Sequence, residues 1–174
     1  MKYLVKLFVV TFILSICTYA SAENKITYID LKYVLNNSKA GKGAQDYLKK
    51  TFNEKQKEFM KIEKELKKEE QDLIAKKDEL SKDEYKKKSD SLRNKVVKYQ
   101  ADRRQSLEKI SKQRSDAKKA LLSKLDPILK NYISENNITV VIDKKNIIAG
   151  KNNVDITNII VEKLNKELPS LKIN

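Results

Sequence analysis

From Ala44 to Asn136 the chain contains no glycine and a single proline, Pro127. The same stretch carries 26 Lys and Arg against 18 Asp and Glu, so nearly half of its residues are charged. A segment this polar cannot be a globular core, and a segment without glycine is too helix-prone to be a loop. We therefore expect a long, basic, solvated helical projection.

Apolar residues recur at intervals of seven in the first half of this stretch, at Phe52, Phe59, Leu66, Leu73 and Leu80. They fill one position of a coiled-coil heptad, whereas the second seam position is mostly charged, so the seam is lean. Ser81 and Glu84 then have the spacing of a capping box, which begins a new helix. We expect a helical hairpin with its tip near 81–83, and one unbroken helix is the alternative.

The returning helix has an apolar seam that thins in its middle and becomes dense again toward Tyr132. Asp126-Pro127 lies in the dense part. Because Pro127 lacks a backbone donor, the pair predicts either a kink or the start of a new helix capped by Asp126.

Short β-branched runs flank the helical stretch. Strands are predicted over 25–30 and 138–143, with a further short strand over 146–149. A helical turn is expected over 31–35, followed by a turn-rich linker over 36–43 that holds two of the three glycines.

A last helix is expected after Asp155, which would cap it. Its apolar side would consist of Ile156, Ile159, Ile160 and Leu164. Pro169 would end it.

The predicted fold class is α+β, with a long coiled-coil-like helical hairpin over 44–129. It stands on a small β-rich body formed by both ends of the chain, 23–43 and 130–174. Because a core of this size is marginal alone, the bodies are expected to associate. The candidate oligomerisation residues are Ile26, Tyr28, Ile138, Val140 and Ile142.

The first residues have the pattern of a secretory signal peptide. A basic start, an apolar run and an Ala-Ser-Ala sequence ending at Ala22 predict cleavage near Ala22 and export from the cytoplasm. Lipid attachment at Cys17 is the alternative, although Ile16 is not the small residue expected before such a cysteine.

The composition excludes most catalytic chemistry. The chain has no histidine, and its one cysteine, Cys17, lies in the leader. Hydrolytic triads and thiolate metal sites therefore lack their usual groups. The glycines at 41–43 lack the spacing of a phosphate-binding loop. Asp30, Asp143 and Asp155 are interpreted as strand ends and helix caps rather than a metal cluster. We expect no enzyme activity, no metal and no cofactor.

The net charge of +14 becomes +12 without the two leader lysines, which predicts an acidic partner. Export argues against nucleic acid and favours an acidic polypeptide or an anionic membrane surface. The candidate binding residues are two seam aromatics and the basic cluster at and beyond the tip. They are Phe52, Phe59, Lys82, Lys86, Lys87, Lys88, Arg93, Lys95 and Lys98. Packing within the hairpin is the other interpretation of the two phenylalanines.

Both ends of the chain resemble a known family. Residues 25–36 (KITYIDLKYVLN) resemble the first strand and turn of the Skp/OmpH family of periplasmic chaperones. Residues 137–149 (NITVVIDKKNIIA), with Val154–Thr157 and the following helix, resemble its closing segment. The charged hairpin between them also matches, so the resemblance covers essentially the whole chain after the leader.

The resemblance implies a soluble periplasmic homotrimer whose strands form a small barrel and whose arms enclose a cavity. Unfolded outer-membrane proteins are held there without ATP, and lipopolysaccharide or another anionic membrane surface is a further partner. The function predicted is therefore an ATP-independent holdase with basic arms. A structural or adaptor coiled-coil protein of the cell envelope is the main alternative, and nucleic-acid binding is a weaker one.

Overall fold

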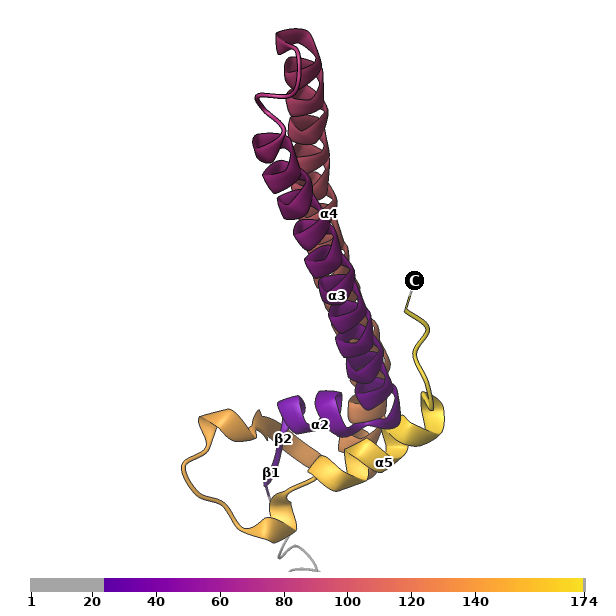
Figure 1. Ribbon diagram of the computed structural model, residues 1–174. Helices are drawn as coiled ribbons and strands as arrows, with labels where there is room; N and C mark the ends of the chain where they lie inside the picture. The colour runs from indigo at the N-terminus through magenta and orange to yellow at the C-terminus, as the bar shows by residue number, and fades with distance from the viewer. Residues whose placement is uncertain (1–23, 174) are drawn as a thin grey trace, which may run out of the picture.

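The computed structural model describes residues 24–173, and it has a long arm standing on a small body (Figure 1). The predicted leader, its cleavage site and Cys17 lie outside the described residues. The elements, in order, are β1 (Lys25–Ile29), α2 (Leu31–Asn37), α3 (Lys39–Ala75), α4 (Lys82–Glu135), β2 (Ile138–Asp143), the 3-10 turns η1 (Lys144–Asn146) and η2 (Asn152–Val154), and α5 (Thr157–Glu167). No described helix is both long and apolar enough to cross a bilayer.

The body is closed by a parallel pairing of β1 with β2, in which Tyr28 lies opposite Ile142. The whole arm separates these two strands in the sequence, so both ends of the chain form one unit, as predicted. One face of the pair packs on α2, α5 and the end of α4. The buried core is formed by Ile29, Val34, Leu125, Ile128, Ile156, Ile160 and Leu164.

Helix α5 packs against this core along one narrow face. Ile156, Ile160 and Leu164 follow one another at intervals of four residues and are buried. The prediction for Ile159 was wrong, because this side chain is 43% exposed. At 100° per residue, position 159 lies well around the helix from the centre of the buried face.

Asp30 and Asp143 are the N-caps of α2 and η1, as interpreted. The prediction that Asp155 caps the last helix was wrong, because Ile156 is the N-cap of α5 and Asp155 lies one residue earlier, in the turn that leads into it. The Asp30 carboxylate accepts the backbone N–H of Tyr33 at 2.7 Å, and that of Asp155 accepts the N–H of Thr157 at 2.9 Å. Asp143 accepts the N–H of Lys145 at 3.2 Å. These hydrogen bonds satisfy donors that have no partner within a helix.

The arm is a hairpin of α3 and α4 rather than one unbroken helix. Ser81 caps α4 and forms the predicted capping box, in which its hydroxyl accepts the N–H of Glu84 and the Glu84 carboxylate accepts the N–H of Ser81. Pro127 lies inside α4, which continues to Glu135, so Pro127 does not begin a new helix. Asp126 pairs instead with Lys130, at 2.7 Å.

The prediction of a linker over 36–43 was wrong. Helix α2 extends to Asn37, and α3 begins at Lys39, with Ser38 accepting the N–H of Gly41 at 3.2 Å. Gly41 is buried in α3, and a Cβ atom there would collide with the Leu35 carbonyl oxygen. Its role is therefore close helix packing rather than flexibility. Both arm helices thus extend beyond the predicted limits of 44 and 129.

The predicted strand over 146–149 was also wrong. The turn η1 occupies its beginning, and Ile148 is fully exposed. One edge of β1 is paired with β2, and a bridge from Tyr28 to Asp155 occupies its other side. Segment 146–149 therefore has no β1 edge to pair with, and the sheet has two strands within residues 24–173.

Candidate functional site

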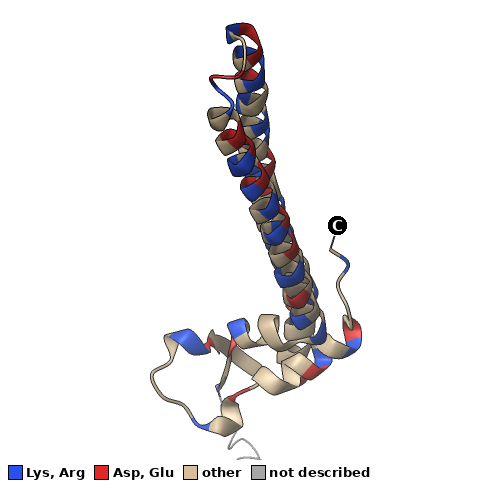
Figure 2. Ribbon diagram, in the orientation of Figure 1, with Lys and Arg blue, Asp and Glu red and all other residues tan. Residues whose placement is uncertain are grey.

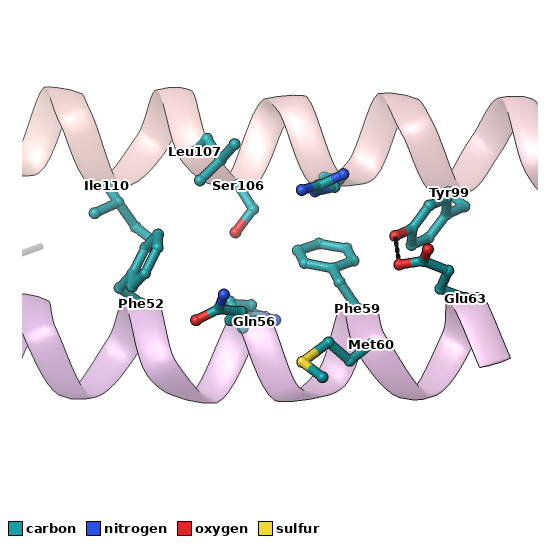
Figure 3. A pocket seen from close by; sticks show the side chains of 11 residues that line it. Phe52, Gln56, Phe59, Met60, Glu63, Tyr99, Ser106, Leu107 and Ile110 are labelled. Atoms are coloured by element: carbon teal, nitrogen blue, oxygen red, sulfur yellow. Dashed lines mark hydrogen bonds between the residues drawn. The ribbon is translucent and has the colours of Figure 1, made fainter.

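The middle of the arm contains a pocket between α3 and α4, with a volume of about 220 Å³ (Figure 3). The rings of Phe52 and Phe59 on α3 point toward α4, where Ile110 and Tyr99 face them. The Phe59 and Tyr99 rings meet edge to face, with centroids 6.0 Å apart and planes at 71°. Both predicted aromatics therefore lie in the seam, but Phe52 remains 40% exposed.

The pocket exists because the seam is lean at this height. Gln56 and Lys55 of α3 and Ser106 of α4 stand where a tighter coiled coil would place large apolar side chains. Since neither Gln56 nor Ser106 fills the gap between the helices, apolar surface stays accessible along the arm.

One polar contact closes the pocket on the tip side. The Tyr99 hydroxyl donates a hydrogen bond to the Glu63 carboxylate at 3.1 Å (Figure 3). Partial burial and this hydrogen bond raise the pKa of Tyr99 above its ordinary value, so the hydroxyl stays protonated. This contact holds α3 to α4 where apolar packing is sparse.

Several exposed apolar side chains of the arm were not among the residues predicted from the sequence. Met60 and Val97 are each at least 60% exposed, and Leu107 is 47% exposed. Met60 and Leu107 line the mid-arm pocket beside the two phenylalanines. The signal was present in the sequence as isolated apolar residues outside the heptad positions, but exposure cannot be assigned without the helix pairing.

Residues of both charge signs follow one another along the whole arm, whereas longer uncharged stretches occur in the body (Figure 2). Three cations of the predicted basic cluster are neutralised: Arg93 pairs with Asp90, Lys95 with Glu69 at 2.6 Å, and Lys98 with Asp102 at 3.0 Å. The Lys95–Glu69 pair joins α4 to α3.

The other four cations of that cluster, Lys82, Lys86, Lys87 and Lys88, form no ion pair with another described residue. They lie in the first two turns of α4. Within the predicted cluster, the cations without an ion pair are therefore the ones nearest the tip, and Lys88 among them acts electrostatically on Glu84.

The five predicted oligomerisation residues divide into two groups. Ile26 and Val140 pair in the sheet and are 52% and 45% exposed, so they form an apolar outer surface. Tyr28 and Ile138 are buried within the chain, and Ile142 is half-buried. The Tyr28 ring is covered by Gly150 and by the Lys144 ammonium, which lies 5.7 Å from the ring centroid.

The body also holds one perturbed carboxyl group. Burial pushes the pKa of Asp155 upward, but hydrogen bonds from Thr157 and the ion pair with Lys144 outweigh it, and the pKa is lowered. This group ties the loop before α5 to the turn after β2, so its contribution is structural.

The sequence of this arm and body matches a known protein family. The family model for OmpH-like outer membrane proteins matches residues 25–164, which include the body strands and the whole hairpin. The chain belongs to this OmpH-like family. In the sequence comparison with curated proteins, nothing matches this chain.

A solved structure supports the OmpH-like fold. It is a Caulobacter crescentus protein, provisionally described as an OmpH-like outer membrane chaperone. The TM-score is 0.80 and the identity 18%, over 90% of this chain and 93% of that chain. At this identity the likeness shows the fold, and that fold is the predicted one of a helical hairpin on a small mixed body.

Proposed function

We propose that this protein is a periplasmic, ATP-independent holdase that binds unfolded outer-membrane proteins between basic helical arms. The observation that carries the proposal is the arm itself, in which apolar side chains are exposed at intervals along a charged surface. Met60, Val97 and Leu107 are the main examples, with Phe52 at the edge of the mid-arm pocket. Membership of the OmpH-like family supports the same class of function.

Such an arm suits a client that has no fixed shape. Precursors of β-barrels expose alternating apolar residues and unpaired strand edges, which make them aggregate. Methionine adapts to irregular apolar surfaces, and lysine stems add apolar area beneath a charged head. Each contact is weak, and several arms acting on one chain bind more tightly than any one arm. Release then requires a better acceptor and no nucleotide.

Several arms require association of the bodies, and we propose a homotrimer. Ile26 and Val140 form an exposed apolar pair on the sheet, which is the surface of the body best suited to contact another copy. Burial of Tyr28 and Ile138 within the chain gives them a supporting role beneath that contact.

The four unpaired lysines at the tip are proposed to meet acidic clients first and to contact lipopolysaccharide or another anionic membrane surface. The electrostatic attraction between these lysines and an approaching acidic partner depends on ionic strength, because the screening length is about 10 Å at 0.1 M salt.

The test is a light-scattering assay of aggregation after dilution of an unfolded β-barrel protein. Wild-type protein without its leader, at one trimer per client, is expected to suppress aggregation, more strongly at low salt. The variant Met60→Ser/Val97→Ser/Leu107→Ser should suppress it several-fold less. The matched control, Gln71→Ser/Asn94→Ser/Gln100→Ser, changes three exposed, uncharged arm positions to the same residue and should retain most activity. Unchanged aggregation with wild-type protein at low salt contradicts the proposal.

The adaptor alternative predicts a single specific partner and no suppression of aggregation. The molecular mass of the protein in solution tests the proposed trimer separately, because a monomer would have no cavity between arms in which to hold a client.

A further inference from the structure

A groove lies in the angle between the arm and the body, with a volume of about 1180 Å³. Its walls come from α2, the beginning of α3, the second half of α4, the last residue of β2 and the start of η1. In Figure 1, α2 lies at the foot of the arm, where these elements meet. The groove is much larger than the mid-arm pocket and lies outside the predicted binding residues except for Phe52.

The floor of the groove is apolar. It follows the contact between α3 and α4 and includes the side of α2 that faces them. Its members are Leu35, Ala44, Leu48, Ala117 and Leu121. Phe52 lies at the distal end and also lines the mid-arm pocket, so the groove and that pocket share one exposed aromatic ring.

Cations surround this floor without enough acids to neutralise them. Lys32, Lys49, Arg114 and Lys118 line the groove, and none of them forms an ion pair within the described part of the chain. Lys144 and Lys145 line it as well, but they are engaged by Asp155 at 3.4 Å and Asp143 at 3.3 Å. Asp30 and Asp46 line the groove too, so together with Asp143 it holds three acids against six cations. The net charge of the lining is therefore +3, and the four cations without an ion pair lie on three helices around one apolar strip.

The groove is long enough for a short peptide. From Ala44 to Phe52, α3 rises about 12 Å, at 1.5 Å per residue. An extended chain advances about 3.3 Å per residue, so about four residues fit along the floor. Alternate side chains of such a segment would point to the floor and to the rim.

We propose that this groove binds an acidic amphipathic segment of an unfolded polypeptide. Its apolar side chains lie on the floor, and its carboxylates pair with Lys32, Lys49, Arg114 and Lys118. The source of the segment rests on the proposed holdase function, and the groove adds to it a preference for clients that alternate acidic and apolar residues.

The shape of the groove argues against other anionic ligands. The floor lies in a concave corner between two parts of the molecule, which a flat bilayer surface cannot reach. Single-stranded nucleic acid binds by stacking bases on aromatic rings, and Phe52 is the one aromatic residue among those that line the groove.

The test is fluorescence anisotropy with the leaderless chain and a labelled peptide of about eight residues that alternates Glu and Leu. Lys49→Glu/Lys118→Glu should weaken binding about tenfold or more, because two attractive contacts become repulsive. Lys49→Arg/Lys118→Arg should retain affinity within about threefold, because the charge is kept. Lys86→Glu/Lys87→Glu makes the same change in net charge at the tip and should alter affinity by less than about threefold, since the tip lies beyond the screening length.

Three outcomes overturn the inference, and a fourth separates it from the proposed function. Equal weakening by the tip variant would mean that net charge alone binds the peptide. If Lys49→Glu/Lys118→Glu changes the oligomer mass measured by light scattering but leaves the peptide affinity intact, the groove is an interface between copies of this chain. No binding of the peptide by wild-type protein that still suppresses aggregation would remove the groove and leave the holdase function. Suppression that is absent while the peptide binds in the groove would remove the holdase function alone.

Discussion

Replacing either of the two glycines at the start of α3 by alanine should change the stability of the protein, but in opposite directions. A Cβ at Gly41 would collide with the Leu35 carbonyl oxygen and lie 2.9 Å from the Ser38 hydroxyl, whereas a Cβ at Gly43 would meet nothing within 4 Å. Backbone atoms cannot move away without shifting α2 against α3. We expect Gly41→Ala to lower the free energy of unfolding by about 2 kcal/mol, as for other overpacked sites.

Gly43→Ala should do the reverse. Gly43 is exposed in the first turns of the same helix, where alanine gains about 0.5–1 kcal/mol over glycine. With a urea slope of about 2 kcal/mol per molar, the midpoint should fall by roughly 1 M for Gly41→Ala and rise by roughly 0.3–0.5 M for Gly43→Ala. Circular dichroism at one fixed protein concentration measures both, which keeps any association constant. A midpoint for Gly41→Ala at or above that of wild type would refute the packing of α2 against α3.

Three further predictions concern the body and the seam. Ile160→Ala should destabilise the protein by about 2–5 kcal/mol in urea unfolding, and Ile159→Ala by less than about 1 kcal/mol, because only Ile160 is buried. Wild type should lose its stability advantage over Asp155→Asn as pH falls through the lowered pKa of Asp155, with the full difference present above about pH 5 in acid titrations of unfolding. Relative to Tyr99→Phe, wild type should lose stability as pH rises above about 10, because the raised pKa keeps Tyr99 protonated only in the folded hairpin; a flat difference to higher pH would contradict this.

Local signals were sufficient for much of the fold. The alternation of β1 and β2, the capping box at Ser81 and Glu84, and the heptad row of Phe52 and Phe59 each depend on residues close in sequence. Such patterns determine which element forms and where it begins. They predicted the hairpin and its position between two strands.

The errors arose where contacts between distant segments decide the outcome. Glycines at 41 and 43 indicate a turn in isolation, yet the approach of Leu35 requires Gly41 inside a helix. The run at 146–149 has strand-forming residues but finds no β1 edge in the chain. The groove was missed for the same reason, since Lys49 and Arg114 are far apart in sequence and meet only through helix pairing.

The parallel pairing of β1 and β2 also fixes an order of assembly. The first strand leaves the ribosome long before its partner at 138–143 has been synthesised, and more than a hundred residues must follow before Tyr28 can lie opposite Ile142. Hairpin contacts between α3 and α4 are more local near the tip and can form earlier. During that interval β1 is an unpaired, β-branched strand with open edges. Every nascent chain of this protein is therefore aggregation-prone until β2 has been synthesised, in the same way as the polypeptides it is proposed to protect.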